Sequence, residues 1–171
     1  MGYTNYLDKY EIIRVTPTLS TDAYAVDDVL FTGVEIPNAV REDGGCSKLT
    51  NMYVLDQQDT SDVDIEFYFT EKNTALGTQN ATANISDANM EAIGFCCAAR
   101  LDTDQSSSGN NIDNLRVHEI VRLDGANIQN TPIGLLQAES GSKSVYVHAI
   151  VTAGTPTFAA DDIDLIFHIE K

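Results

Sequence analysis

The chain has 171 residues, which fits one domain with its own core, and its 26 acidic and 10 basic side chains give a formal net charge of −16. A surface of that sign repels phosphate backbones and anionic lipid headgroups, so it disfavours nucleic-acid binding and membrane-surface binding. No apolar run approaches the roughly 20 residues that a membrane-spanning helix needs, and the N-terminus shows no apolar signal-peptide core.

The first ten residues are rich in tyrosine. Tyr3, Tyr6, Leu7 and Tyr10 come before the first clear strand, and only two of the ten side chains are charged. Tyrosine offers a large contact area at low entropic cost and is favoured at interfaces. The segment therefore predicts an arm that contacts a neighbouring subunit. The alternative is that these side chains cover the core of their own domain.

After this arm, apolar residues recur at every second position, which is typical of strands with one buried face. The clearest run is 62–69, in which Phe67 points into the core while Asp64 and Tyr68 point out. The C-terminal run repeats the pattern, with Phe167 on its apolar face. The predicted strands lie, in chain order, at residues 11–16, 28–32, 47–55, 62–69, 94–101, 115–122, 133–137, 144–151 and 162–169.

One short helix is predicted near residues 86–94, between the fourth and fifth of these strands. Ser86 can cap its N-terminus, and Gly94 can end it. Met90 and Ile93 lie three residues apart, so they are expected to face the core.

Stretches rich in glycine, serine and proline separate the strands and read as turns. Roughly eight or nine short strands with spaced turns predict an all-β fold, an antiparallel β-sandwich for which a jelly roll is one arrangement. The predicted organisation is an N-terminal arm and first strand over residues 1–20, followed by a single β-sandwich domain over residues 21–171.

The three histidines do not form a metal-binding motif. His118, His148 and His168 each fall within a predicted strand, at positions expected to face away from the main core. They fit neither the HExxH spacing nor a Cys/His finger. We expect them to be solvent-facing or locally hydrogen-bonded, although a folded sheet could still bring distant histidines together.

The three cysteines make a poor disulfide framework, because their number is odd and two of them are adjacent. Cys96 and Cys97 lie in an apolar run, so they are interpreted as unreactive thiols in the core. Cys46 stands alone in the sequence. No structural disulfide is predicted.

Acidic residues are too plentiful for a pair of them to indicate a site. Asp102 and Asp104 form the better calcium candidate, whereas Asp161, Asp162 and Asp164 lack the glycine and glutamate of an EF-hand loop. A solvated acidic loop is the simpler interpretation of the first group, and the second runs into the last strand, where Asp162 and Asp164 would share an exposed face. Without tryptophan, a Gly-x-Ser-x-Gly elbow or a phosphate loop, the chain is predicted not to be an enzyme, with no catalytic, cofactor-binding or metal-binding residues.

Several stretches carry a resemblance to a known family. They are residues 27–31 (DDVLF), 34–41 (VEIPNAVR) with the glycine pair that follows, 75–78 (ALGT), 85–89 (ISDAN), 144–147 (SVYV), 154–158 (GTPTF) and 163–167 (IDLIF). With these stretches the chain resembles a group of small virion structural proteins of tailed bacteriophages, notably marine and cyanobacterial ones. The resemblance spans about residues 24 to 171 and supplies no functional residues.

This resemblance implies a particle component assembled in the host cytoplasm, such as a head decoration or cement protein. Its partners would be the major capsid protein and copies of itself, as a homo-oligomer for which a trimer is one option. A tail or fibre component is the alternative within the virion. A carbohydrate-binding β-sandwich, with calcium dependence as one option, is the alternative from another class, although the absence of tryptophan argues against it.

The net charge also bears on how such a protein would attach. Because long-range attraction to an acidic capsid exterior is unfavourable, attachment is expected to rest on apolar contact, pairing at a sheet edge, or the arm. Attachment of this kind should survive high salt.

Overall fold

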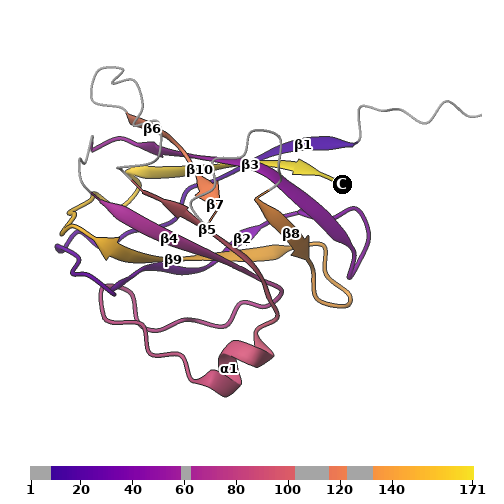
Figure 1. The fold of residues 1–171 in the computed structure, drawn as a ribbon, viewed down its shortest axis with the longest axis horizontal. Coiled ribbons are helices and arrows are strands. Elements are labelled where there is room, and N and C mark those ends of the chain that lie inside the picture. The colour runs from indigo at the N-terminus through magenta and orange to yellow at the C-terminus, as the bar shows by residue number, and fades with distance from the viewer. Residues whose placement is uncertain (1–8, 59–62, 103–115, 123–132) are drawn as a thin grey trace, which may run out of the picture.

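The computed structural model describes residues 9–58, 63–102, 116–122 and 133–171. Every strand predicted from the sequence overlaps a strand of the structure (Figure 1). No described helix is long and apolar enough to cross a membrane. The elements are, in chain order, β1 (Tyr10–Val15), β2 (Val29–Ile36), β3 (Cys46–Asp56), β4 (Asp64–Thr70), α1 (Asp87–Ala92), β5 (Phe95–Leu101), β6 (Arg116–Glu119), β7 (Val121–Arg122), β8 (Gly134–Gln137), β9 (Val145–Ala153) and β10 (Ile163–Glu170).

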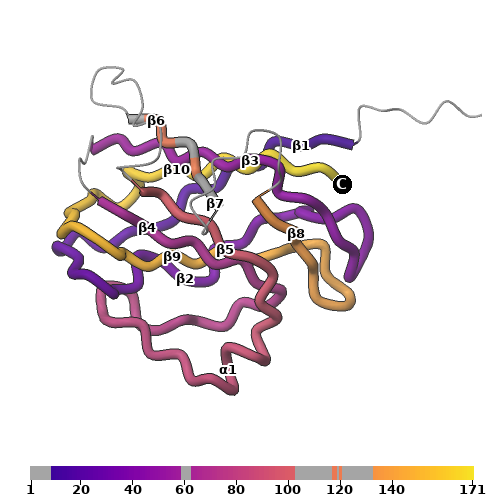
Figure 2. The backbone as a smooth tube through the Cα atoms, viewed as in Figure 1, coloured from indigo at the N-terminus to yellow at the C-terminus, as the bar shows by residue number. Residues whose placement is uncertain are grey.

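The strands form two antiparallel sheets that pack against each other (Figure 2). The first sheet has the order β1–β10–β3–β6, with β8 paired to the beginning of β3. The second sheet has the order β2–β9–β4–β5–β7. The chain changes sheet between β1 and β2, between β2 and β3, and again between β3 and β4. Together with the return through β9 and β10, these orders make a jelly roll, so the predicted all-β sandwich is confirmed.

The core between the sheets follows from the period-two pattern. Burial alternates along the whole of β10, and Phe67 and Phe167 are both fully buried. Phe69 of β4 meets Phe167 edge to face, with ring centroids 6.0 Å apart and an interplanar angle of 84°. Such pairs add to the stabilisation that area burial alone provides. The predicted inward orientation of both phenylalanines is confirmed.

The outer face of the second sheet is covered by the chain itself. Residues 71–94, which we call the crossover segment, connect β4 to β5, include α1, and lie at the bottom of Figure 1. Leu76 and Ile93 of this segment are buried with Val29 in a second, smaller core, and Met90 and Tyr68 pack against it. The segment therefore buries side chains that alternation alone assigns to solvent.

The predicted helix is present, although it is short. Ser86 caps it by accepting a hydrogen bond from the backbone N–H of Asn89 at 3.3 Å. Gly94, just beyond it, has a φ of 72°, a left-handed conformation that glycine adopts without strain. Ile93 is fully buried and Met90 partly so, which confirms the predicted face of the helix.

His148 points away from the main core, as predicted, but the crossover segment buries it completely. Its Nδ1 accepts hydrogen bonds from the backbone N–H of Gly33 at 2.9 Å and from Thr32 Oγ1 at 2.8 Å. Its Nε2 lies 2.9 Å from Thr70 Oγ1, which itself donates to the carbonyl of Lys72. The expected solvent exposure is wrong, and the alternative of local hydrogen bonding is right.

The close approach of the crossover segment to β2 also explains why residue 33 is a glycine. Gly33 has a φ of 64°, and a Cβ there would lie 1.7 Å from Asn73 Oδ1 of the crossover segment. A side chain at position 33 would therefore displace the Asn73 side chain and would strain the left-handed backbone.

The other two histidines differ from each other. His168 is half-buried on the outer face of the first sheet, with its ring 5.4 Å from that of Tyr53, so its predicted outward orientation holds. His118 is fully buried and is the register partner of Val54, whose side chain lies in the core. Its expected outward orientation is therefore wrong, because the register of β6 is set by its pairing with β3. Of the two apolar residues Val117 and Ile120, it is Ile120 that is buried.

Candidate functional site

One end of the sandwich joins two distant parts of the chain. β1 begins beside the end of β10, with Tyr10 opposite Glu170 and the Lys171 N–H donating to the Lys9 carbonyl at 2.8 Å (Figures 1 and 2). Within the described residues β1 pairs with β10 alone, so it is an edge strand. Edge strands present unpaired backbone groups that can pair with another chain.

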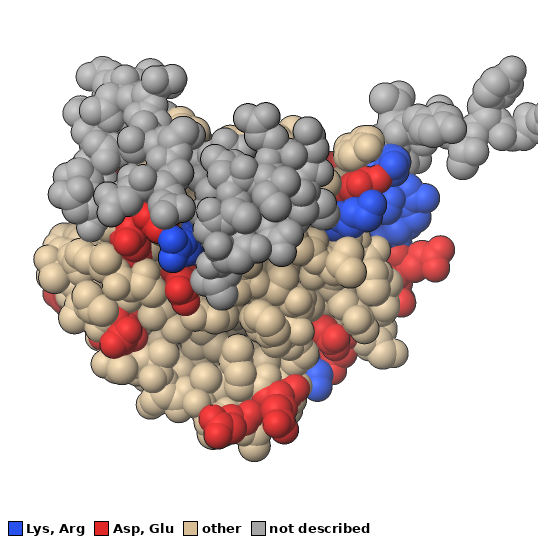
Figure 3. Space-filling model, viewed as in Figure 1, with Lys and Arg blue, Asp and Glu red and all other residues tan. Residues whose placement is uncertain are grey.

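Positive charge gathers at this end of an otherwise acidic molecule (Figure 3). The surface carries Lys9, Arg41, Lys48, Lys143 and Lys171, half of the ten basic residues of the chain. Carboxylates accompany them and form ion pairs with several. The end is therefore mixed in charge, in contrast with the overall charge of −16.

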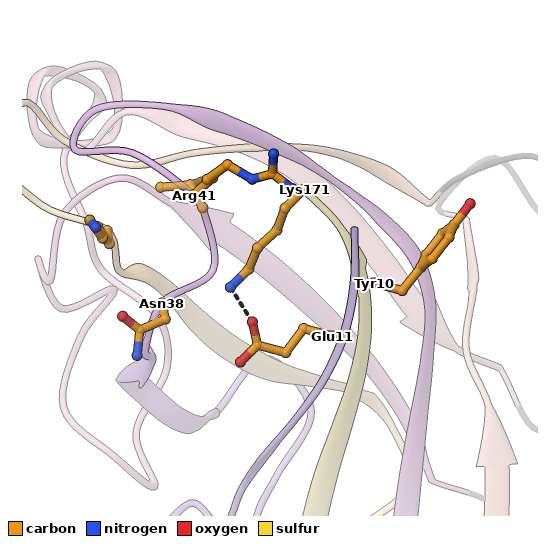
Figure 4. A pocket seen from close by; sticks show the side chains of 7 residues that line it. Tyr10, Glu11, Asn38, Arg41 and Lys171 are labelled. Carbon is orange, nitrogen blue, oxygen red and sulfur yellow. Dashed lines mark hydrogen bonds and ion pairs between the residues drawn. The ribbon is translucent and has the colours of Figure 1, made fainter. Parts of the chain in front are cut away.

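A pocket of about 670 Å³ opens among these side chains (Figure 4). It lies between the paired ends of β1 and β10 and the loops 37–45 and 138–144. The residues that line it are Tyr10, Glu11, Asn38, Val40, Arg41, Lys143 and Lys171. Among these described residues three are cationic and one is anionic.

The loop 37–45 is fixed by its own sequence. Asn38 has a φ of 53°, a left-handed conformation that asparagine tolerates better than most residues, and it turns the chain after β2. Ala39 and Val40 are then buried in the main core at 0% and 1% exposure, which leaves Arg41 at the surface beside the pocket. The turn thus directs Arg41 outward, while Ala39 and Val40 anchor the loop in the core.

The second loop is bonded to the first. The Val40 N–H donates to the Lys143 carbonyl at 3.2 Å, and the Gly44 N–H donates to the Ser142 carbonyl at 2.8 Å. Backbone bonds between two loops limit their relative movement. Arg41 and Lys143 therefore stand on two loops that are hydrogen-bonded to each other, although about a hundred residues separate them in the sequence.

Lys171 is the most enclosed cation of the pocket. Its side chain is 10% exposed, and its Nζ forms an ion pair with Glu11 of β1 (Figure 4). Tyr10 stands apart from this pair. Lys143 makes no ion pair with any side chain that the structure describes, and its side chain is exposed.

Glu170 adds to the electrostatics beside the pocket. It forms ion pairs with Lys9 and with Lys48, the latter at 3.4 Å. Its pKa is lowered, chiefly by the hydrogen bond from Lys9, and the same bond raises the pKa of Lys9. The two lysine side chains are about half exposed, so water screens these pairs and their effect on stability is small.

The predicted arm can be followed only at its end. Tyr3, Tyr6 and Leu7 lie outside the described residues. Tyr10 belongs to β1, is 63% exposed, and has Lys9 Nζ 5.3 Å from its ring centroid. With Ile12, which is 53% exposed, it gives the edge strand two large exposed apolar side chains next to the pocket.

The calcium candidates lie toward the opposite end of the sandwich, where their carboxylates serve local structure. Asp102 forms an ion pair with Arg100, and Asp104 lies outside the described residues. Asp162 accepts a hydrogen bond from a backbone N–H of its own turn, and Asp164 accepts one from a threonine hydroxyl. Within the described part of the chain, no three potential ligands cluster as a metal site.

The cysteines gather around β8. Cys46 is exposed and is the register partner of Gln137, whose carbonyl accepts a long hydrogen bond from Cys96 Sγ at 3.6 Å. Cys97 packs closely against Gly134. Burial raises the pKa of Cys96, and it raises the pKa of Cys97 to about 12, so both thiols stay protonated at neutral pH. Both are half-buried against the core, whereas Cys46 is not.

Sequence reasoning did not identify the pocket. Arg41, Lys143 and Lys171 stand in separate parts of the chain, and no motif connects them. The jelly-roll topology brings them together, and only the scarcity of basic residues could have drawn attention to them. No protein-family model matches the chain, and neither a curated protein nor a solved structure matches it.

Proposed function

We propose that this chain is a virion structural protein, a decoration protein that binds the head lattice of a tailed bacteriophage. The observation that carries the proposal is the end of the sandwich at which β1 begins. There an open sheet edge, two exposed apolar side chains and a rigid polar pocket lie together. This combination suits attachment to another protein.

The fold and the sequence resemblance support the same interpretation. Jelly rolls build viral capsid domains, and they also build lectin domains, so the fold by itself does not distinguish the virion function from carbohydrate binding. The resemblance over residues 24 to 171 favours the virion. The predicted partners are the major capsid protein and copies of this chain.

The pocket suits binding rather than catalysis. Among the described side chains that line it, the one carboxylate is that of Glu11, which is engaged by Lys171. His148 is fully buried under the crossover segment, and both of its ring nitrogens have hydrogen-bond partners within the fold. A protein that coats a particle needs a stable scaffold and an attachment surface, and both features are consistent with that role.

Co-sedimentation with undecorated heads tests the proposal. The variant to compare with the full-length chain lacks residues 1–8, because Lys9 and Tyr10 already belong to the contacts between β1 and β10. We expect the full-length chain to pellet with heads, and the truncated chain to bind at least tenfold more weakly while keeping its melting temperature. Failure of the full-length chain to bind heads would reject the decoration function.

A matched pair of variants tests whether binding depends on the apolar side chains of residues 1–8 or only on the length of that segment. The triple change Tyr3→Ala, Tyr6→Ala and Leu7→Ala should weaken binding nearly as much as the truncation, whereas Thr4→Ala with Asn5→Ala should not. Immunogold labelling of tails instead of heads would favour the tail or fibre alternative. Glycan binding that a chelator abolishes would favour the carbohydrate-binding alternative.

A further inference from the structure

The outer edge of β1 presents backbone groups at every second residue. The Lys171 N–H donates to the Lys9 carbonyl at 2.8 Å, so these two residues form a hydrogen-bonded pair of the antiparallel ladder between β1 and β10. Bonded and non-bonded pairs alternate in such a ladder, and the register is continuous along β1. The backbone N–H and C=O groups of Tyr10, Ile12 and Arg14 therefore point away from β10, toward the edge of the sheet (Figure 1).

The side chains of these three residues share the outer face of the sheet. Ile13, between two of them, is buried, whereas Tyr10, Ile12 and Arg14 are exposed. β1 thus presents an aromatic, an aliphatic and a cationic side chain in one row, and it contains no proline. An edge strand with exposed apolar side chains and no proline is a template for a further strand.

This row is complementary to itself. In an antiparallel pair related by a two-fold axis perpendicular to the sheet, directly opposed residues lie on the same face of the sheet. When Ile12 lies opposite Ile12 of a second copy, each Tyr10 lies opposite Arg14 of the other copy. All three residues then occupy hydrogen-bonded positions, and each arginine lies beside a tyrosine ring, which allows a cation–π contact.

The edge also suits the approach of another acidic chain. Within β1 the charged residues are Glu11 and Arg14, so the strand has a formal charge of zero, whereas the whole chain carries −16. Two copies therefore repel each other less along β1 than along an average part of their surfaces. Salt screens the remaining repulsion and has little effect on backbone pairing or apolar contact.

We propose that two copies of the chain pair antiparallel through β1, with Ile12 at the two-fold axis, so that their first sheets become one continuous sheet. The inference deepens the proposed function and rests on it for the expectation that copies of the chain are partners. A strand of the major capsid protein is the competing occupant, but the self-complementary row of β1 favours a second copy. A contact through one strand pair is smaller than a standard protein interface, so the dimer should be weak.

Analytical ultracentrifugation of the full chain tests the dimer without any virion component. Over protein concentrations from about 10 µM to about 1 mM, we expect the average mass to rise reversibly from that of a monomer toward that of a dimer. An increase from about 0.1 M to about 1 M salt should strengthen the association at least twofold, because it screens the repulsion between two acidic copies. A chain that stays monomeric throughout, or a dimer that salt weakens, would overturn the proposal.

A substitution at the two-fold axis locates the interface. Ile12→Lys places two lysines opposite each other, so it should raise the dissociation constant of the dimer at least tenfold. The matched control is Leu135→Lys, which changes a similarly exposed apolar side chain on β8, across β3 from β10 and β1. The control should change the dissociation constant less than twofold. Both variants add one positive charge, and unchanged melting temperatures verify their folding. Equal weakening by the two variants would reject the interface.

A double variant tests the register of the pair. Tyr10→Lys places a lysine opposite Arg14 of the other copy and should weaken the dimer at least fivefold. Tyr10→Lys combined with Arg14→Glu creates an attractive pair at the same position, so it should recover most of the affinity. In a shifted register residues 10 and 14 do not meet. An absence of rescue would therefore contradict the pairing about Ile12.

Hydrogen exchange follows the same interface in the unmodified chain. The amides of Tyr10, Ile12 and Arg14 should exchange at least tenfold more slowly at the highest protein concentration than at the lowest. The amides of Glu11 and Ile13, which already face β10, should be protected equally at both concentrations. If all five amides are equally protected at the lowest concentration, another part of the chain covers the edge and the proposal is wrong.

The two proposals can fail separately. The chain that lacks residues 1–8 keeps β1, so it should dimerise within twofold of the full chain; loss of the dimer on truncation would place the contact in the arm and overturn this inference. If the full chain dimerises through β1 but does not bind heads, the decoration function fails while this inference stands. If the chain stays monomeric and Ile12→Lys weakens binding to heads, the edge accepts a strand of the capsid protein, and this inference fails while the decoration function stands.

Discussion

The two outer faces of the sandwich differ in what covers them. On the second sheet, the crossover segment buries His148 and packs against Tyr68. On the first sheet, His168 and Ile166 occupy equivalent outward positions of β10 and stay half-buried. All four alternate with core residues in the same way, so period-two patterning specifies which side a residue takes but not whether that side meets water.

The largest loss of stability is expected for a substitution in the core between the two sheets, and the effects on the two outer faces can be compared with it. Phe167→Ala deletes a fully buried ring that meets Phe69, so it should cost about 3–5 kcal/mol of unfolding free energy. Asp64→Asn, on the outward side of β4, should cost well under 1 kcal/mol. Urea denaturation of both variants measures the difference. The reverse order would contradict the assigned faces.

The next effect concerns the buried histidine. Burial lowers the pKa of His148 to about 4, below its ordinary value near 6.5, so the unfolded chain binds more protons than the folded chain between these two values. The free energy of unfolding should therefore fall as pH falls from about 6.5 to 4, by up to about 3 kcal/mol, and this term should be constant above pH 6.5.

Denaturation curves across this pH range measure that slope for the wild type and for His148→Gln. The glutamine removes the titrating group, so the difference between the two curves isolates it from the carboxylates that titrate nearby. A wild-type slope that persists unchanged in the variant would show that His148 does not carry it.

The smallest of these effects compares the two outer faces directly. Leu76→Ala removes a buried side chain of the crossover segment and should cost about 2–3 kcal/mol, whereas Ile166→Ala, at a half-buried position on the outer face of the first sheet, should cost roughly 1 kcal/mol or less. Hydrogen exchange should show faster opening of residues 71–94 in the first variant only. Equal costs would mean that the crossover segment adds little to the stability of the second sheet.

The sequence predicted the strands and the helix because their signals are local. Alternation around Phe67 and Phe167, and a capping serine at Ser86, depend only on neighbours along the chain. The face of β6 was misassigned, because Val117 and Ile120 give an ambiguous alternation that only pairing with β3 resolves. The cover over the second sheet was missed because residues 71–94 are a polar, turn-rich stretch.

The end of the sandwich at which β1 begins was only partly predictable from the sequence. Its tyrosines stand out in composition, so an arm near Tyr10 could be proposed from the sequence. The pocket could not, because Arg41, Lys143 and Lys171 become neighbours only through long-range strand pairing. A group of residues that the topology assembles from three separate parts of the chain has no spacing that a motif could describe.

The pairing of β1 with β10 also bears on the order of events as the chain is made. It joins Tyr10 to Glu170, so the chain must be synthesised through residue 170 before this ladder is complete. Closing so long a loop is entropically costly, and folds dominated by such contacts fold in roughly milliseconds to seconds. Glu11 and Lys171, on the two sides of the ladder, are both walls of the pocket. A chain in which β1 and β10 have not yet paired therefore has no complete pocket.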